Sequence, residues 1–330
     1  MLLFITLLRA LAACVITNSH YTGVYPTDAI ANGGLLGDVL FFAVSGFCLA
    51  NPRQSFGRWY AHRLFRILPA VWLATLAYAA IGFHSLSPLR DLVWPTRYHF
   101  VGSILVLYIP FFGVMRADCL RSRLPHLMLA VLAAELAVYL FAYDRSRYHI
   151  DDVHEPAILF LFFESMLLGA WFSQRRETMT VRLSPWAIAL SLPLACAYAA
   201  SKLYFSRSGA RLDFQIANQA VLFALLAALF RAAMGTERLL PRIPAQLFRP
   251  VAFLSTLTLE IYVVQYELIP RIAPRLSFPL NWLAITAAIL ASAWLVHLAA
   301  ERLGRLENKI FRSSGSPTSP TAASAPESTP

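Results

Sequence analysis

The stretch WLAITAAILASAWLVHLAA, residues 282–300, decides the fold class of this chain. It contains no aspartate, glutamate, lysine or arginine, and it approaches the roughly 20 apolar residues that cross a bilayer core as a helix. Similar runs recur in the sequence: VWLATLAYAAIGF, LMLAVLAAELAVYLFAY, WAIALSLPLACAYAA and QAVLFALLAALF. The runs lack the alternation of a barrel strand, and backbone groups in lipid must be bonded within their own segment. Each run is therefore predicted to be a helix.

The composition of the whole chain supports a membrane protein. Of the 330 residues, 58% are hydrophobic, whereas a soluble domain has about 45–50%. We predict an all-α, polytopic membrane bundle of about ten transmembrane helices. The predicted spans are 1–18, 33–51, 67–84, 98–115, 125–143, 156–173, 183–201, 214–231, 250–270 and 278–300.

Ten spans place both termini on one side of the membrane. The loops on that side hold roughly twice as many lysines and arginines as the opposite loops, and this bias predicts that both termini are cytoplasmic. Residues 1–312 are predicted to form one integral membrane domain. Residues 313–330 are rich in Ser, Thr, Pro and Ala and are predicted to be a disordered tail.

The net charge of +10 comes largely from short loops between apolar runs. We therefore expect contact with membrane lipids and no binding of nucleic acid. The four cysteines lie far apart in the sequence, three of them in apolar segments, without the spacing of metal ligands. We expect no metal site, and we expect the cysteines to be small buried apolar residues.

The first span carries two polar residues that a simple anchor does not need. Arg9 and His20 are separated by three helical turns and about 20°, so they share one face of a helix, roughly 16 Å apart along its axis. Charged groups at such depth usually face a bundle interior or a cavity. The alternatives are that Arg9 reaches the near membrane surface and that His20 lies in an interfacial loop.

The second span adds Asp38 and Ser45, seven residues apart and on one helical face. Asp38 can pair with Arg9 or orient the imidazole of His20, although a purely structural ion pair is an alternative. Glycines in the same segment permit close helix contact, namely Gly33, Gly34, Gly37 and Gly46.

A basic segment follows, NPRQSFGRWYAHRLFRILP, residues 51–69, which contains no acidic residue. Arg63 and Arg66 are neighbours on a helix surface, and Pro69 fits the first turn of the next span. Arginine forks beside a helix N-terminus can hold phosphates. The alternative is a loop that contacts anionic lipid headgroups.

Taken in order, these segments resemble the membrane acyltransferase 3 family of integral membrane O-acyltransferases, which modify polysaccharides and glycosides. The resemblance covers the chain except its tail. Gln265 stands where many members have histidine, and the usual W-F-L motif is missing. The matching motifs are FITLLRALAACVITNSHY (4–21), NGGLLGDVLFFAVSGFCL (32–49), HRLFRILP (62–69), SMLLG (165–169) and STLTLEIYVVQYEL (255–268).

The resemblance implies an enzyme of the bacterial inner membrane with no bound cofactor. The donor would be cytoplasmic acyl-CoA, usually acetyl-CoA, and the acceptor a sugar hydroxyl of a cell-surface polysaccharide or glycan precursor. His20 would act as general base, with Asp38 or Arg9 shaping its environment, or with Arg9 stabilising the oxyanion. The alternative to this direct transfer is a covalent relay in which His20 itself carries the acyl group.

The remaining expected contacts concern the two substrates. Arg58, Arg63 and Arg66 would bind the CoA phosphates. Ser45, Glu260 and Gln265 are candidates for substrate binding. An exporter or flippase of a lipid-linked sugar is an alternative function, since many spans and an internal polar stripe also fit it. A non-catalytic partner of a polysaccharide synthase is another.

Overall fold

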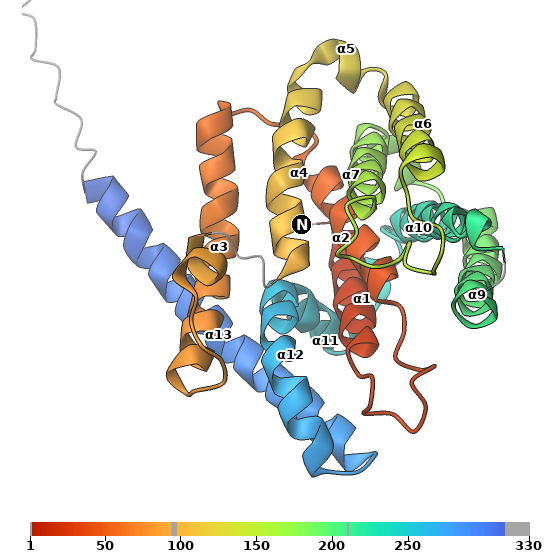
Figure 1. Ribbon diagram of the computed structural model, residues 1–330. Coiled ribbons are helices and arrows are strands. Elements are labelled where there is room, and N and C mark those ends of the chain that lie inside the picture. Colours follow the sequence, from red (N-terminus) through yellow and green to blue (C-terminus); the bar gives the residue numbers. More distant parts are fainter. Residues whose placement is uncertain (1, 94–97, 210, 314–330) are drawn as a thin grey trace, which may run out of the picture.

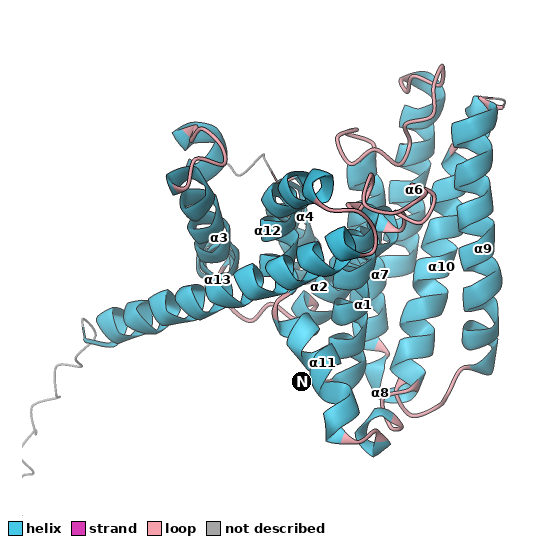
Figure 2. Ribbon diagram, turned by 90° about the horizontal axis from the view of Figure 1, so that it is seen from below, coloured by secondary structure: helices cyan, strands magenta, loops and turns pink. Residues whose placement is uncertain are grey.

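The computed structural model describes residues 2–93, 98–209 and 211–313, and these contain helices and loops but no strand (Figure 2). The predicted all-α class is confirmed. Residues 314–330 of the predicted tail lie outside the described residues. The longer helices are α1 (Leu3–Ser19), α2 (Gly34–Leu49), α3 (Phe56–Ala80), α4 (His99–Arg116), α6 (Leu124–Phe141), α7 (Ile158–Gln174), α9 (Pro185–Ser208), α10 (Ile216–Gly235), α11 (Ala245–Thr256), α12 (Thr258–Ile272) and α13 (Leu280–Ser313). Short turns connect them: α5 (Asp118–Arg121), α8 (Arg176–Met179), η1 (Leu89–Val93), η2 (Leu212–Phe214), η3 (Leu240–Arg242) and η4 (Ala273–Arg275).

Each predicted span overlaps one helix or the pair α11 and α12. Within the described ranges, six helices are long and apolar enough to cross a membrane, and the bent pair would make a seventh. The helices α1, α2 and α7 have 17, 16 and 17 residues, about 25 Å, which is less than the ~30 Å bilayer core. The count of ten and the side of the termini therefore stay predictions.

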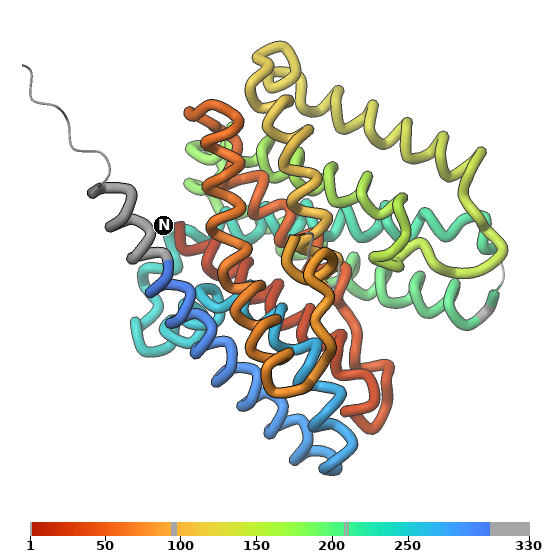
Figure 3. The backbone as a smooth tube through the Cα atoms, turned by 60° about the vertical axis from the view of Figure 1, so that its left-hand side comes forward, coloured from red at the N-terminus to blue at the C-terminus, as the bar shows by residue number. Residues whose placement is uncertain are grey.

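The short helices α1 and α2 lie in the middle of the bundle. Figures 1 and 3 show α3 and α13 on one side of them and α6, α9 and α10 on the other. Short helices that lie between longer ones need not span the bilayer thickness themselves.

The backbones of α2 and α7 touch each other. A Cβ atom at Gly46 would overlap the carbonyl oxygen of Met166, and one at Gly169 would overlap the carbonyl oxygen of Ala43. On the side of α2 that faces α1, a Cβ atom at Gly37 would lie 2.8 Å from the carbonyl oxygen of Ala12. The predicted close helix contact at the glycines of the second span is confirmed at these two positions.

The basic segment and the following span differ from the prediction, because they form the single helix α3 and Pro69 lies inside it. A helix that continues through proline loses one backbone hydrogen bond. A new start at Pro69 would instead leave several N–H groups without partners near lipid. The predicted set of free N–H groups at Pro69 is therefore wrong.

The predicted span 250–270 is also not a single helix. It is broken at Leu257 into α11 and α12, which are inclined by 68°. The hydroxyl of Thr258 donates to the carbonyl oxygen of Ser255 at 2.7 Å and so satisfies a backbone group beside the break. The expectation of buried cysteines is wrong as well, since all four are exposed. A thiol is weakly polar and tolerates lipid as well as a protein interior.

The α2–α7 contact can be tested with Gly169→Ala. The added methyl group meets backbone rather than a side chain that can move, so we expect the free energy of unfolding to fall by about 1–3 kcal/mol. The measurement is the Tm of the detergent-solubilised protein. Gly113→Ala in α4 is the matched control, because nothing lies within 4 Å of its added Cβ. Equal Tm values for the two variants would contradict the backbone contact.

Candidate functional site

A cavity of about 300 Å³ lies at the end of α1 and the beginning of α2. His20 and Asp38 both line it, as do residues from α9, α12 and the segment between α6 and α7. We call it the His20 cavity. Its lining residues are Ile16, Ser19, His20, Ala31, Asn32, Gly34, Leu35, Asp38, Phe100, Asp151, Asp152, Val153, His154, Phe162, Lys202, Tyr262 and Tyr266.

The imidazole of His20 follows directly after the last turn of α1. Its ring meets the ring of Tyr266 edge-on, with 4.9 Å between the ring centres. The hydroxyl of Tyr266 donates to the hydroxyl of Tyr262 at 2.9 Å. The ring contact restricts the orientation of His20, and the tyrosine hydroxyls make the cavity wall polar.

Asp38 enters the cavity from α2, and only 7% of its surface is exposed. It lies within electrostatic range of Tyr262 and Tyr266. Among the described residues no hydrogen bond or ion pair joins Asp38 to His20 or to Arg9. Of the predicted catalytic residues, the structure thus brings His20 and Asp38 to one cavity without direct contact.

Arg9 lies elsewhere on the same face of α1. Its guanidinium donates to the hydroxyl of Thr258 at 3.1 Å, so both Arg9 and His20 contact α12. The prediction that the two residues share one helical face is confirmed. Since α1 is continuous between them, they are separated by about 16 Å along its axis, and Arg9 does not line the His20 cavity.

Three arginines gather near the end of α2. Arg9, Arg63 and Arg66 all lie within electrostatic range of Cys48, and we call them the arginine cluster. The Nε atom of Arg63 is buried without a hydrogen-bond partner. Arg58 lies exposed in the first turn of α3. Like charges this close together favour an anionic ligand, and guanidinium groups match the geometry of phosphates.

The three predicted substrate-binding residues lie outside the lining of the His20 cavity. Ser45 shares a side-chain hydrogen bond with Tyr108, which is within electrostatic range of Arg63 and Arg66. Glu260 accepts a hydrogen bond from Nδ1 of His297 at 2.9 Å. Gln265 is fully buried, and neither of its side-chain amide atoms has a partner.

One wall of the cavity was not predicted from the sequence. The backbone N–H groups of His149 and Ile150 donate to Oε1 of Gln215, at 3.1 and 3.2 Å. Nε2 of Gln219 donates to the carbonyl oxygen of Ile150 at 2.7 Å, and Nδ2 of Asn218 donates to Asp151 at 2.7 Å. Buried polar side chains at the start of α10 therefore fix the segment that carries Asp151.

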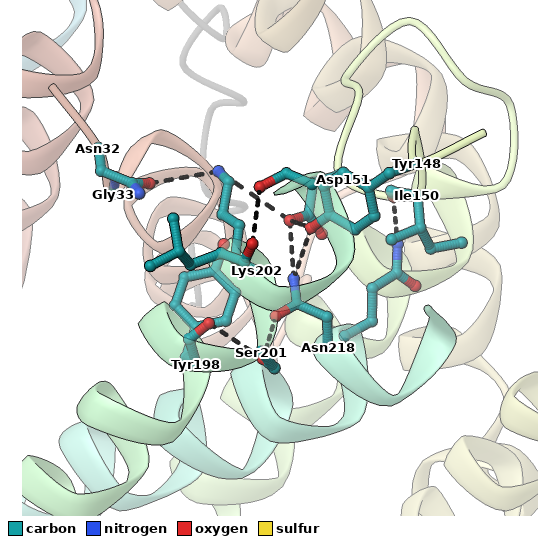
Figure 4. Close-up of polar contacts among 12 residues, drawn as sticks. Asn32, Gly33, Tyr148, Ile150, Asp151, Tyr198, Ser201, Lys202 and Asn218 are labelled. Carbon is teal, nitrogen blue, oxygen red and sulfur yellow. Dashed lines mark hydrogen bonds and ion pairs between the residues drawn. The ribbon is translucent and has the colours of Figure 1, made fainter. Parts of the chain in front are cut away.

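Lys202 of α9 lies at the same wall (Figure 4). Its ammonium donates to Oδ1 of Asn32 at 3.2 Å and lies 4.0 Å from Oδ2 of Asp151. Burial raises the pKa of the Asp151 carboxyl, while Lys202 and the hydrogen bonds from Tyr148 and Asn218 oppose that rise. These contacts link the α1–α2 loop, α9 and the segment before α7.

A family model described as an acyltransferase domain matches residues 2–299. The chain belongs to the membrane acyltransferase 3 family. No curated protein and no solved structure matches the chain. The family match includes the His20 cavity and the arginine cluster, and it confirms the resemblance seen in the motifs. Together with the apolar helices it supports acyltransferase activity in an integral membrane protein.

The role of Gln215 in holding the Asp151 wall of the His20 cavity can be tested with Gln215→Ala. The substitution leaves two backbone N–H groups without their acceptor, at a cost of about 1–3 kcal/mol for each group that stays buried. We expect faster hydrogen exchange in residues 147–151, measured by mass spectrometry. Gln174→Ala removes the same side chain at an exposed position and is the control. Unchanged exchange in 147–151 would show that Gln215 does not hold the segment.

Proposed function

We propose that the protein is an O-acyltransferase of the bacterial inner membrane. It moves an acyl group, in the simplest case acetyl, from cytoplasmic acyl-CoA to a sugar hydroxyl of a cell-surface polysaccharide or glycan precursor. The observation that carries the proposal is the arrangement on α1: His20 faces a cavity, and Arg9 joins the arginine cluster about three turns away on the same face.

The acceptor chemistry requires a base. A sugar hydroxyl has a pKa far above 7 and must lose its proton as its oxygen bonds to the thioester carbonyl carbon. Neutral His20 takes this proton, the carbon–sulfur bond breaks, and CoA leaves as the thiolate. General base catalysis of this kind contributes about 10²–10⁴-fold. Tyr266 holds the imidazole, and Asp38 adds a polar group to the same cavity.

The donor chemistry requires cations for the CoA phosphates. Arg63 and Arg66 supply them from α3, and Arg9 adds a third. Because Arg9 is about 16 Å from His20 along α1, it is too distant to stabilise an oxyanion formed beside His20. We therefore assign Arg9 to the donor rather than to the transition state at the acceptor.

The separation of about 16 Å between the two ends suits the pantetheine arm of CoA, whose extended length is comparable. Gln265 lies two helical turns after Thr258 on the same face of α12. Its side-chain amide offers a donor and an acceptor, both unused, and the arm contains secondary amides that can pair with both. This contact gives a buried polar side chain a role that compensates its burial.

The role of His20 is tested with His20→Ala in membranes supplied with labelled acetyl-CoA. We expect base-labile label on glycans to fall at least ~100-fold, the loss of a general base. His126→Ala, at an exposed position in α6, is the matched control. Retained transfer by His20→Ala would exclude the role. Glycan export by the wild type without consumption of acetyl-CoA would instead support the exporter.

The donor site is tested with Arg63→Gln and Arg66→Gln. Each removes charge-assisted bonds to phosphate worth about 1.5–3 kcal/mol, so KM for acetyl-CoA should rise roughly tenfold or more. KM for the acceptor should stay unchanged. Arg275→Gln, at the exposed end near η4, is the control and should leave both constants unchanged. A rise in acceptor KM instead of donor KM would place the acceptor at the cluster.

A further inference from the structure

The wall of the His20 cavity that Asp151 and Lys202 form contains unused hydrogen-bonding groups. The Asp151 side chain is 7% exposed, and its Oδ2 accepts from Tyr148 and Asn218, while its Oδ1 has no partner among the described residues. Lys202 makes one hydrogen bond, to Asn32, and its contact with Asp151 is 4.0 Å long. An ammonium group has three donors, so Lys202 retains donors for a ligand. Asp151 and Lys202 lie side by side (Figure 4), and both residues line the cavity.

The charges that line the cavity disfavour an anionic ligand. The acidic and basic side chains of the described lining are Asp38, Asp151, Asp152, His20, His154 and Lys202. Lys202 already faces the carboxylate of Asp151, and Asp152 bonds Nδ1 of His154 at 3.0 Å. A carboxylate or phosphate on the ligand would find no cluster of cations in this described lining, because Lys202 is the one lysine there and it shares the cavity with the carboxyl groups of Asp38, Asp151 and Asp152.

The remaining lining suits an uncharged ring with hydroxyl groups. Phe100 and Phe162 offer apolar surface, and the tyrosine hydroxyls offer hydrogen bonds. Small-molecule sites commonly combine apolar walls with a few placed polar groups. A hydroxyl both donates and accepts, so one hydroxyl of the ring can donate to Asp151 while a second accepts from Lys202.

We propose that Asp151 and Lys202 recognise the acceptor, with Asn32 holding the ammonium of Lys202, and that this acceptor is an uncharged sugar rather than an acidic one. The inference rests on the proposed acyl transfer at His20. Two hydroxyls of the ring bind Asp151 and Lys202, and another hydroxyl of the same ring faces His20. These residues are positioning and specificity residues, and they take no part in the proton transfer.

The charge of the acceptor is tested by labelling membranes with acetyl-CoA that carries a labelled acetyl group. Glycosidase digestion at neutral pH keeps the ester and cuts the labelled glycans to single sugars, and anion exchange separates neutral from acidic sugars. Base-labile label in the neutral fraction supports the inference, and label confined to the acidic fraction overturns it. Absence of label from both fractions with the wild type, while the donor is also not consumed, counts against the proposed acyl transfer instead.

The residues are tested with Lys202→Gln and Asp151→Asn on the purified neutral acceptor. We expect at least a tenfold rise in acceptor KM, with donor KM unchanged and kcat within about threefold. Lys202→Arg should recover part of the affinity. Lys202 is partly exposed, so its variant should fold even if Asp151→Asn does not. The control is Asp213→Asn, which changes an exposed aspartate in η2, just before α10. If the acceptor KM of Lys202→Gln equals that of the wild type, the assignment of Lys202 to acceptor binding is overturned.

Discussion

The contact between the backbones of α2 and α7 positions both ends of the site. Gly46 and Gly169 remove the side chains that would hold these helices apart, and Gly37 allows α1 to approach the other side of α2. With α2 held between α1 and α7, its first half carries Asp38 to the His20 cavity. Its last turns carry Cys48 to the arginine cluster. A small shift of α2 would therefore disturb both ends together.

The second constraint is the cost of burying charge in a membrane protein, which is tolerated only where partners or a polar cavity exist. The guanidinium of Arg9 has a partner in the hydroxyl of Thr258. Thr258 lies directly after the α11–α12 break, where the chain bends by 68°. His20 meets the constraint at the opposite end of α1 through the cavity and Tyr266. The single helix α1 thus fixes the distance between Arg9 and His20 at about three turns.

The fold was largely predictable because long apolar runs leave few alternatives in lipid, and the shared face of Arg9 and His20 follows from 100° per residue. The break at Leu257 was not predicted, because hydropathy does not register the hydroxyl-rich STLT sequence that satisfies the freed backbone. The wall with Asp151 and Lys202 depends on packing between segments distant in sequence. A signal did exist: Gln215, Asn218 and Gln219 are spaced by three and four residues at the start of an apolar run.

The two ends of the site differ in how they are built, and this has a consequence for specificity. Arg9 and His20 belong to one helix, so their separation cannot change without disturbing α1. The wall of Asp151 belongs to a segment held by side chains of α10 rather than by its own secondary structure. Connecting segments on a rigid scaffold tolerate sequence change better than the scaffold itself. If the segment binds the acceptor as proposed, substitutions in it change which acceptor fits while the helices that hold His20 and the arginine cluster stay in place.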